Sequence, residues 1–281
     1  MAEQVILIII SGGDIASTNQ AESLLKKCEW TTGPLVEGFR TWNRNSVRLW
    51  WRDGGVLFED NLDLRWENMT TERVLEVIFP SRHVAASGLP CLTIHPIGTP
   101  QYEVDEKPPF GGKSADAPPP SPRMSAWMKE LKKQASNHDL LDEFTVSFET
   151  THHGPWISVP SLFIEIGSTE DKWGNKKAAS ALADVIISGL NLNSNVMIPE
   201  INPKKVVFCL GGGHYAPQPM RLSDKGVVLG HMLANYALNM EKIEGELTSE
   251  NLPKGPWKQA IIAAYNSTKI ANPNSEVWAY L

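Results

Sequence analysis

The feature that most restricts the fold of this 281-residue chain is a set of short, mostly apolar segments. The first is VILIII at residues 5–10, and comparable runs follow at VLEVIF (74–79), SLFIEI (161–166) and KVVFCL (205–210). Strands buried on both faces of a sheet are typically apolar throughout, whereas half-exposed strands alternate with polar residues. A sheet that is buried on both faces needs helices over each of them, so these segments predict an α/β fold.

Segments with the apolar spacing of helices lie between these runs. The expected helices span residues 17–28, 124–136, 168–190 and 254–270. Ser17 or Thr18 is the expected N-cap of the first helix. Further strands are expected at 46–51, 55–58, 91–94, 143–149 and 276–281. The alternation favours a mixed, mostly parallel sheet flanked by helices, with a long Pro/Gly-rich loop at 100–122.

The composition restricts the classes of function. The chain has 26 Lys and Arg against 32 Asp and Glu, which argues against a general nucleic-acid coat but leaves room for a local basic patch. Its three cysteines form no CxxC pair and are typical of reduced thiols in the cytoplasm. The apolar run at 5–10 is too short to span a bilayer and follows no basic leader, so we expect a core strand and no membrane association.

Most of the histidines occupy equivalent places in this pattern. Six of the seven follow an apolar, strand-like run within five residues: His83, His95, His152, His153, His214 and His231. In open α/β sheets, ligands bind beyond the carboxyl ends of the strands. The sequence therefore predicts that these imidazoles gather at one edge of the sheet. The alternative is that each one caps a turn independently.

Imidazoles and a carboxylate at one place suit either a zinc site or a general base. The spacing matches neither HExxH nor the zinc-finger pattern. Glu165, inside the run 161–166, is costly to bury unless it is paired, although strand alternation could instead turn it toward solvent. His152 and His153 are adjacent and would point to opposite sides of an extended chain, so we expect only one of them to reach the site.

The stretch GGGHYAP (211–217) follows the buried run at 205–210. Three glycines in a row let backbone N–H groups approach a ligand, so an oxyanion or phosphate contact is expected at Gly211, Gly212 and Gly213. The GK[ST] ending of a P-loop is absent. A tight turn without a ligand is the alternative.

Four stretches taken together resemble one family. LTIHPIG (92–98), TTHHGP (150–155), FIEIGSTE (163–170) and GGGHYAP (211–217), in this order, are similar to the archaeal and plant type of D-aminoacyl-tRNA deacylase. The resemblance implies a zinc-dependent hydrolase that cleaves the ester between a D-amino acid and tRNA, with a role in translation quality control. It also implies an α/β fold similar to those of phosphorylases and peptidyl-tRNA hydrolase, and a monomer.

The same resemblance implies the extent of the domain and the site residues. Residues 1–281 are expected to form a single domain whose last strand is cut short at the C-terminus. The matching motifs imply site residues at His95, His152, His153, Glu165 and His214. Among these we infer zinc ligands at His95, His152 and His214, and catalytic roles for Glu165, His153 and His214. Metal-activated water would attack the ester, and Glu165 or a free histidine would take its proton.

The tRNA backbone requires cations. Residues 26–52 carry a local excess of basic side chains, and we expect phosphate contacts at Lys26, Lys27, Arg44 and Arg48. A solvated charged face is the alternative.

Two other functions remain open at this point. One is a peptidyl-tRNA hydrolase, or another metal-free hydrolase on the same fold. The other is a non-catalytic RNA-binding module in which the histidines are structural caps.

Overall fold

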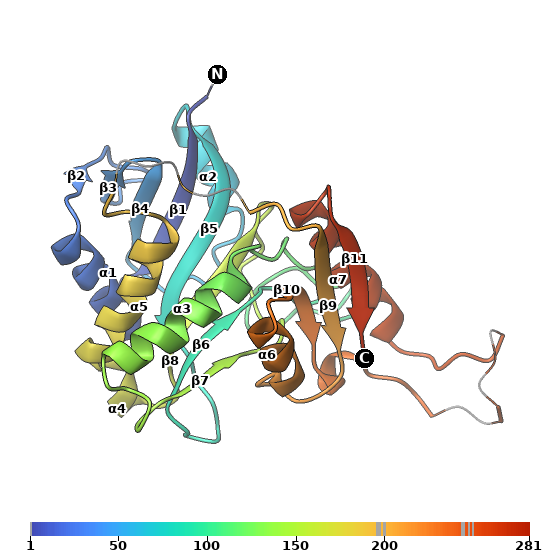
Figure 1. Cartoon of the computed structure of the whole chain (residues 1–281). Helices are drawn as coiled ribbons and strands as arrows, with labels where there is room; N and C mark the ends of the chain where they lie inside the picture. The colour runs from blue at the N-terminus through green and yellow to red at the C-terminus, as the bar shows by residue number, and fades with distance from the viewer. Residues whose placement is uncertain (1, 195–197, 199–200, 243–244, 247, 249) are drawn as a thin grey trace.

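The computed structural model describes residues 2–281 except 195–197, 199–200, 243–244, 247 and 249, and its strands form two sheets (Figure 1). The larger sheet has eight strands in the order β2-β3-β4-β1-β5-β8-β6-β7. These are β1 (Gln4–Ser11), β2 (Thr31–Thr32), β3 (Thr41–Arg44), β4 (Val47–Arg52), β5 (Arg73–Arg82), β6 (Cys91–His95), β7 (Thr145–Phe148) and β8 (Ser161–Gly167). The central pairs β4-β1, β1-β5 and β5-β8 are parallel. The predicted fold class, a mixed and mostly parallel sheet flanked by helices, is confirmed.

The run VILIII is apolar throughout because β1 is covered on both faces. Its even-numbered side chains, Ile6, Ile8 and Ile10, belong to one hydrophobic core, and Val5, Leu7 and Ile9 belong to a second core on the other face. The helices α1 (Ile15–Lys27), α3 (Met124–Asn137) and α5 (Lys176–Gly189) cover the first face, and α2 (Leu62–Met69) packs on the second (Figure 1).

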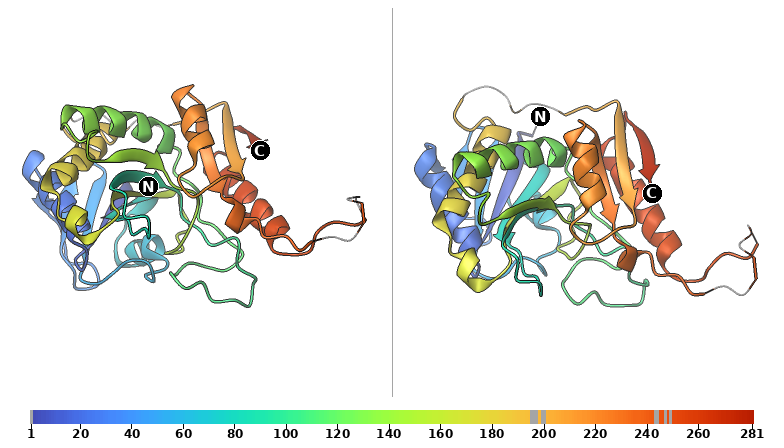
Figure 2. Two further views of the ribbon diagram at one scale, coloured as in Figure 1. Left: turned by 90° about the horizontal axis from the view of Figure 1, so that it is seen from below. Right: turned by 60° about the horizontal axis from the view of Figure 1, so that its bottom comes forward.

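The smaller sheet lies beside β7 and has three parallel strands in the order β10-β9-β11 (Figure 2). They are β9 (Lys205–Leu210), β10 (Val228–Leu233) and β11 (Glu276–Tyr280), accompanied by α6 (Pro217–Asp224), the 3-10 helix η1 (Asn235–Ala237) and α7 (Trp257–Ala271). The strand expected at 276–281 is therefore present. Two backbone bonds join the sheets where β7 ends: Thr150 N–H donates to His214 O (2.8 Å), and Thr151 N–H donates to Met232 O (2.7 Å).

Some local expectations were wrong. Residues 55–58 form a turn and loop, not a strand, because this backbone packs against the 100–122 loop instead of joining a ladder. The helix expected at 168–190 is two helices, α4 (Glu170–Trp173) and α5, separated at Gly174. Among the described residues, no helix is long and apolar enough to cross a membrane.

The N-cap of α1 is Asp14, not Ser17 or Thr18. Its Oδ1 accepts the N–H groups of Ala16 (2.9 Å) and Ser17 (3.3 Å). Its Oδ2 accepts Arg82 N–H (2.8 Å) and the Ser81 hydroxyl (3.2 Å). Asp14 therefore ties the start of α1 to the end of β5.

Because Asp14 makes four such bonds, we expect Asp14→Ala to lower the free energy of unfolding by about 3 kcal/mol. Urea denaturation followed by circular dichroism measures this. Asn175→Ala is the matched control, since Asn175 caps α5 by a single bond to Ala178 N–H (2.9 Å) and should cost about 1 kcal/mol. Equal losses in the two variants would show that the link to β5 adds nothing.

Candidate active site

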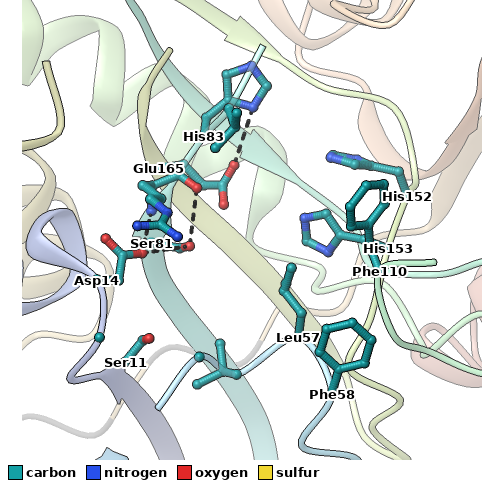
Figure 3. Close-up of a pocket in the computed structure, with 15 residues that line it drawn as sticks. Ser11, Asp14, Leu57, Phe58, Ser81, His83, Phe110, His152, His153 and Glu165 are labelled. Carbon is teal, nitrogen blue, oxygen red and sulfur yellow. Dashed lines mark hydrogen bonds and ion pairs between the residues drawn. The ribbon is translucent and has the colours of Figure 1, made fainter. Parts of the chain in front are cut away.

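A cavity of about 470 Å³ opens at the carboxyl ends of β1, β5 and β8 (Figure 3). These three strands run parallel, so Ser11 at the end of β1, Ser81 near the end of β5 and Glu165 in β8 come together there. The polar part of the lining includes Asp14, Ser81, His83, His152, His153 and Glu165. The expectation that a ligand site lies at this edge of the sheet agrees with this arrangement.

The histidines converge next to the cavity from two directions. His83 follows β5, which runs parallel to β8, whereas His95 ends β6, which runs antiparallel to β8. In this register His95 lies opposite Phe163, two residues before Glu165. The sequence suggested that all these histidines would lie at one edge of the sheet. Instead, His83 and His95 follow strands of opposite direction and meet beside β8.

Three imidazoles form one group: His95, His152 and His153. One ring nitrogen from each lies within 4.8 Å of the others. In each ring Nδ1–H donates to a backbone carbonyl, that of Pro96 (3.0 Å), Thr150 (2.8 Å) and Gly154 (2.7 Å), respectively. These bonds leave the proton on Nδ1, so each Nε2 carries a free lone pair.

Burial keeps these three rings neutral. It lowers the pKa of His95 to about 4 and that of His153 to about 3, and the pKa of His152 lies well below its ordinary value. His95 Nε2 is buried and, within the described part of the chain, has no hydrogen-bond partner. A buried acceptor beside two other lone pairs is the arrangement that a bound metal ion would satisfy, so this donor set fits zinc.

Both members of the adjacent pair reach the cavity. The expectation that only one would do so was wrong, because His153 has a φ of +43° and does not continue an extended chain. The backbone turns there, and the two rings lie 4.3 Å apart between centroids.

A second group surrounds Glu149, a fully buried residue that sequence reasoning missed. Its Oε2 accepts hydrogen bonds from His214 Nε2 (2.8 Å) and His83 Nδ1 (3.0 Å). Burial by itself would raise the pKa of Glu149, but the bonds from His214 and His83 bring it well below its ordinary value. An acidic residue directly after the strand-like run, in FETTHH, was the signal that could have found it.

Glu165 has the opposite electrostatic environment. It is buried, as the costly-burial argument anticipated, and its Oε2 lies 3.5 Å from His95 Nε2 and 3.7 Å from His83 Nδ1. Burial, together with the nearby charge of Glu149, raises the pKa of Glu165 well above its ordinary value. Figure 3 shows Glu165 facing the cavity between His83 and Ser81.

Two predicted features lie apart from the cavity. His231 is buried, with Nδ1 beside Thr151 Oγ1 (2.9 Å) and Nε2 beside Pro118 O (3.0 Å), so both ring nitrogens are occupied and the expectation that it joins the others was wrong. In the glycine stretch, Gly211 N–H donates to Leu233 O (2.8 Å) and Gly212 N–H to Asn235 Oδ1 (3.1 Å). These bonds leave neither N–H free for an oxyanion. Together with Gly213, the turn instead places His214 against Glu149.

The four predicted phosphate contacts lie toward the other end of the sheet. Val47, at the start of β4, pairs with Ile6, whereas the cavity is at Ser11. Arg48 is buried and bonds Glu3 (2.9 Å) and Glu72 (2.6 Å), while Lys27 bonds Asp184 (2.6 Å). Arg44 donates to Leu192 O (2.9 Å), and Lys26 is on the last turn of α1. A role in binding tRNA thus stays a prediction for these residues.

Comparison with known proteins gives a consistent result. The family model described as D-aminoacyl-tRNA deacylase matches residues 70–274. A D-aminoacyl-tRNA deacylase of Arabidopsis thaliana is 41% identical, over 99% of this chain and 90% of the relative. One from Pyrococcus furiosus is 33% identical, over 82% of this chain and 80% of the relative. The crystal structure of a conserved protein of unknown function shares the fold, with a TM-score of 0.72 at 23% identity, covering 99% of this chain and 96% of that one.

Proposed function

This chain belongs to the D-aminoacyl-tRNA deacylase family, and on that premise we propose that its histidine cavity hydrolyses D-aminoacyl-tRNA with the help of a zinc ion. The products are a free D-amino acid and tRNA. The observation that carries the proposal is that one ring nitrogen from each of His95, His152 and His153 lies within 4.8 Å of the others, beside the buried carboxyl of Glu165.

In this proposal His95, His152 and His153 hold the metal. A zinc ion supplies polarisation of the ester carbonyl and makes water a stronger nucleophile at neutral pH. The carbonyls of Pro96, Thr150 and Gly154 fix the three rings in the required tautomer. This set contains His153 in place of His214, because His214 is bonded to Glu149.

The two buried glutamates have separate roles, one in proton transfer and one in orienting imidazole rings. Hydrolysis removes one proton from the attacking water and adds one to the departing ribose oxygen, so a group in the cavity wall must take the first and give the second. We assign this role to Glu165, because it lines the cavity and its raised pKa brings the carboxyl nearer to the operating pH, where one group can both take and give a proton. Glu149 lies behind the wall and orients His83 and His214 through its two short bonds.

We also propose that residues 1–281 act as one unit, as a monomer in the cytoplasm. The site supports a single unit, because Glu149 follows β7 of the larger sheet whereas His214 follows β9 of the smaller one. The three cysteines are buried free thiols, as expected in a reducing compartment.

The activity is tested by comparing three substrates: D-tyrosyl-tRNA, L-tyrosyl-tRNA and an N-blocked peptidyl-tRNA. We expect release of D-tyrosine, with the L form and the blocked form spared. Equal rates on the D and L forms would refute the deacylase function. Preferential cleavage of the blocked form would assign the chain to the peptidyl-tRNA hydrolases, and binding without cleavage would make it an RNA-binding module.

A further inference from the structure

The cavity changes character between its floor and its mouth. The floor is polar and closed, since the lining residues His83 and Glu165 are only 4% and 2% exposed. The mouth is aromatic and open, since Phe58 and Phe110 line the same cavity yet are 64% and 62% exposed. Figure 3 shows both rings on the side of His153 and away from Glu165. Neither ring belongs to a hydrophobic core among the described residues, so their exposure needs another explanation.

The loops that carry Phe58 and Phe110 pack closely against each other and against the backbone next to His153. Gly111 has a φ of +72°, and a Cβ at this position would collide with the carbonyl of Leu57. A Cβ on Gly154 would lie 2.6 Å from the same carbonyl oxygen. Gly154 N–H also donates to Phe110 O (3.0 Å). Because Gly154 directly follows His153, the backbone that carries Phe58 and Phe110 is held at a set position relative to the imidazoles.

We propose that Phe58 and Phe110 stack on the terminal adenine base of the substrate tRNA. This inference rests on the proposed function, which places the ester at the histidines. A cavity of about 470 Å³ cannot admit the body of a tRNA, so only the aminoacylated end enters. The ribose of the terminal adenosine carries the ester, so its base lies next to the cavity, within reach of the two exposed rings at the mouth.

Stacking on exposed aromatic rings is the usual way in which proteins hold unpaired bases, because every base has a flat apolar face. The amino-acid side chain is on the other side of the ester and lies deeper, away from the two rings. The base is the same in every tRNA, whereas the side chain varies. The two rings therefore supply binding that does not depend on the amino acid, which suits an enzyme that accepts several D-aminoacyl-tRNAs.

The stacking is tested with uncharged tRNA that carries 2-aminopurine in place of the terminal adenine, a base whose fluorescence is quenched on stacking. We expect quenching by the unmodified protein, and about 5- to 150-fold weaker binding by Phe58→Leu and Phe110→Leu, which keep an apolar side chain but remove the ring. Phe110→Trp should retain the quenching. Val104→Ala is the matched control, because Val104 is in the same loop, is 73% exposed and is not part of the cavity lining. Unchanged binding and quenching in both leucine variants would overturn the proposal.

Kinetics then separate the base from the amino acid. With D-tyrosyl-tRNA and D-alanyl-tRNA, each leucine variant should raise KM by the same factor for both substrates and leave kcat nearly unchanged. A loss confined to D-tyrosyl-tRNA would place the amino-acid side chain at the rings and overturn the proposal. If the unmodified protein cleaves neither substrate, the proposed function fails, while the 2-aminopurine measurement still decides whether the rings stack on the base.

Discussion

His153→Asn is expected to release the bound zinc and to lower the rate of D-tyrosyl-tRNA hydrolysis by about 10³-fold or more. His153 supplies one of the three converging ring nitrogens. A catalytic metal lowers the barrier by several kcal/mol, and each 1.4 kcal/mol corresponds to a factor of ten in rate. Asparagine suits this position because the φ of +43° is in the left-handed region, which asparagine tolerates better than alanine. Elemental analysis of the purified protein and single-turnover kinetics measure the two effects.

The matched control is His138→Ala. His138 lies outside the cavity and bonds Asp184 (2.8 Å), so its loss should leave zinc content and rate unchanged. Circular dichroism checks that both variants are folded. If His153→Asn retains full zinc and normal rates, the ligand set proposed above is incorrect. The group of His83, Glu149 and His214 would then be the metal site, and His214→Ala would lose the zinc instead.

Glu165→Gln is expected to lower kcat by about 10²- to 10⁴-fold while zinc remains bound. The amide keeps the volume of the side chain but cannot pass a proton from the attacking water to the ribose oxygen. Glu76→Gln is a suitable control, because Glu76 is also a buried glutamate of the same sheet but pairs with Arg123 (2.7 Å), outside the cavity lining. It should affect stability and leave kcat unchanged.

The outcome at Glu149 decides between the two carboxylates. Glu149→Gln should perturb the orientation of His83 and His214 and so lower activity less than Glu165→Gln does. If Glu165→Gln keeps a normal kcat and Glu149→Gln does not, proton transfer belongs to Glu149.

The local pattern of apolar residues was sufficient to predict the main strands of the fold. The runs at 5–10, 74–79, 161–166 and 205–210 all fall within strands, because burial on both faces excludes polar residues at most positions. Two of these runs contain a carboxylate, Glu76 and Glu165. A carboxyl in a buried strand is costly unless it is paired; Glu76 is paired with Arg123, whereas Glu165 lines the cavity.

Features that depend on strand direction or on a single dihedral angle were not accessible in this way. The sequence contains no sign that β6 runs antiparallel to β8, which is why His95 meets Glu165 over the middle of a strand. Nor does the pair His152-His153 reveal the positive φ that turns both rings into the cavity. Glu149 went unnoticed because its partners, His83 and His214, are distant in sequence.

By itself, then, the sequence determined which residue types would be buried, where the strands and most helices would form, and that imidazoles would follow several strands. These properties depend on neighbours a few residues away, through the periodicity of apolar side chains. Only the tertiary structure decided which histidine nitrogens converge, which carboxyl lines the cavity, and which aromatic rings lie at its mouth. Those arrangements depend on strand order, on the bond from Thr150 to His214 that joins the two sheets, and on the contact of Gly111 with Leu57. Each of them joins segments that are far apart in the chain, and no local pattern specifies such a contact.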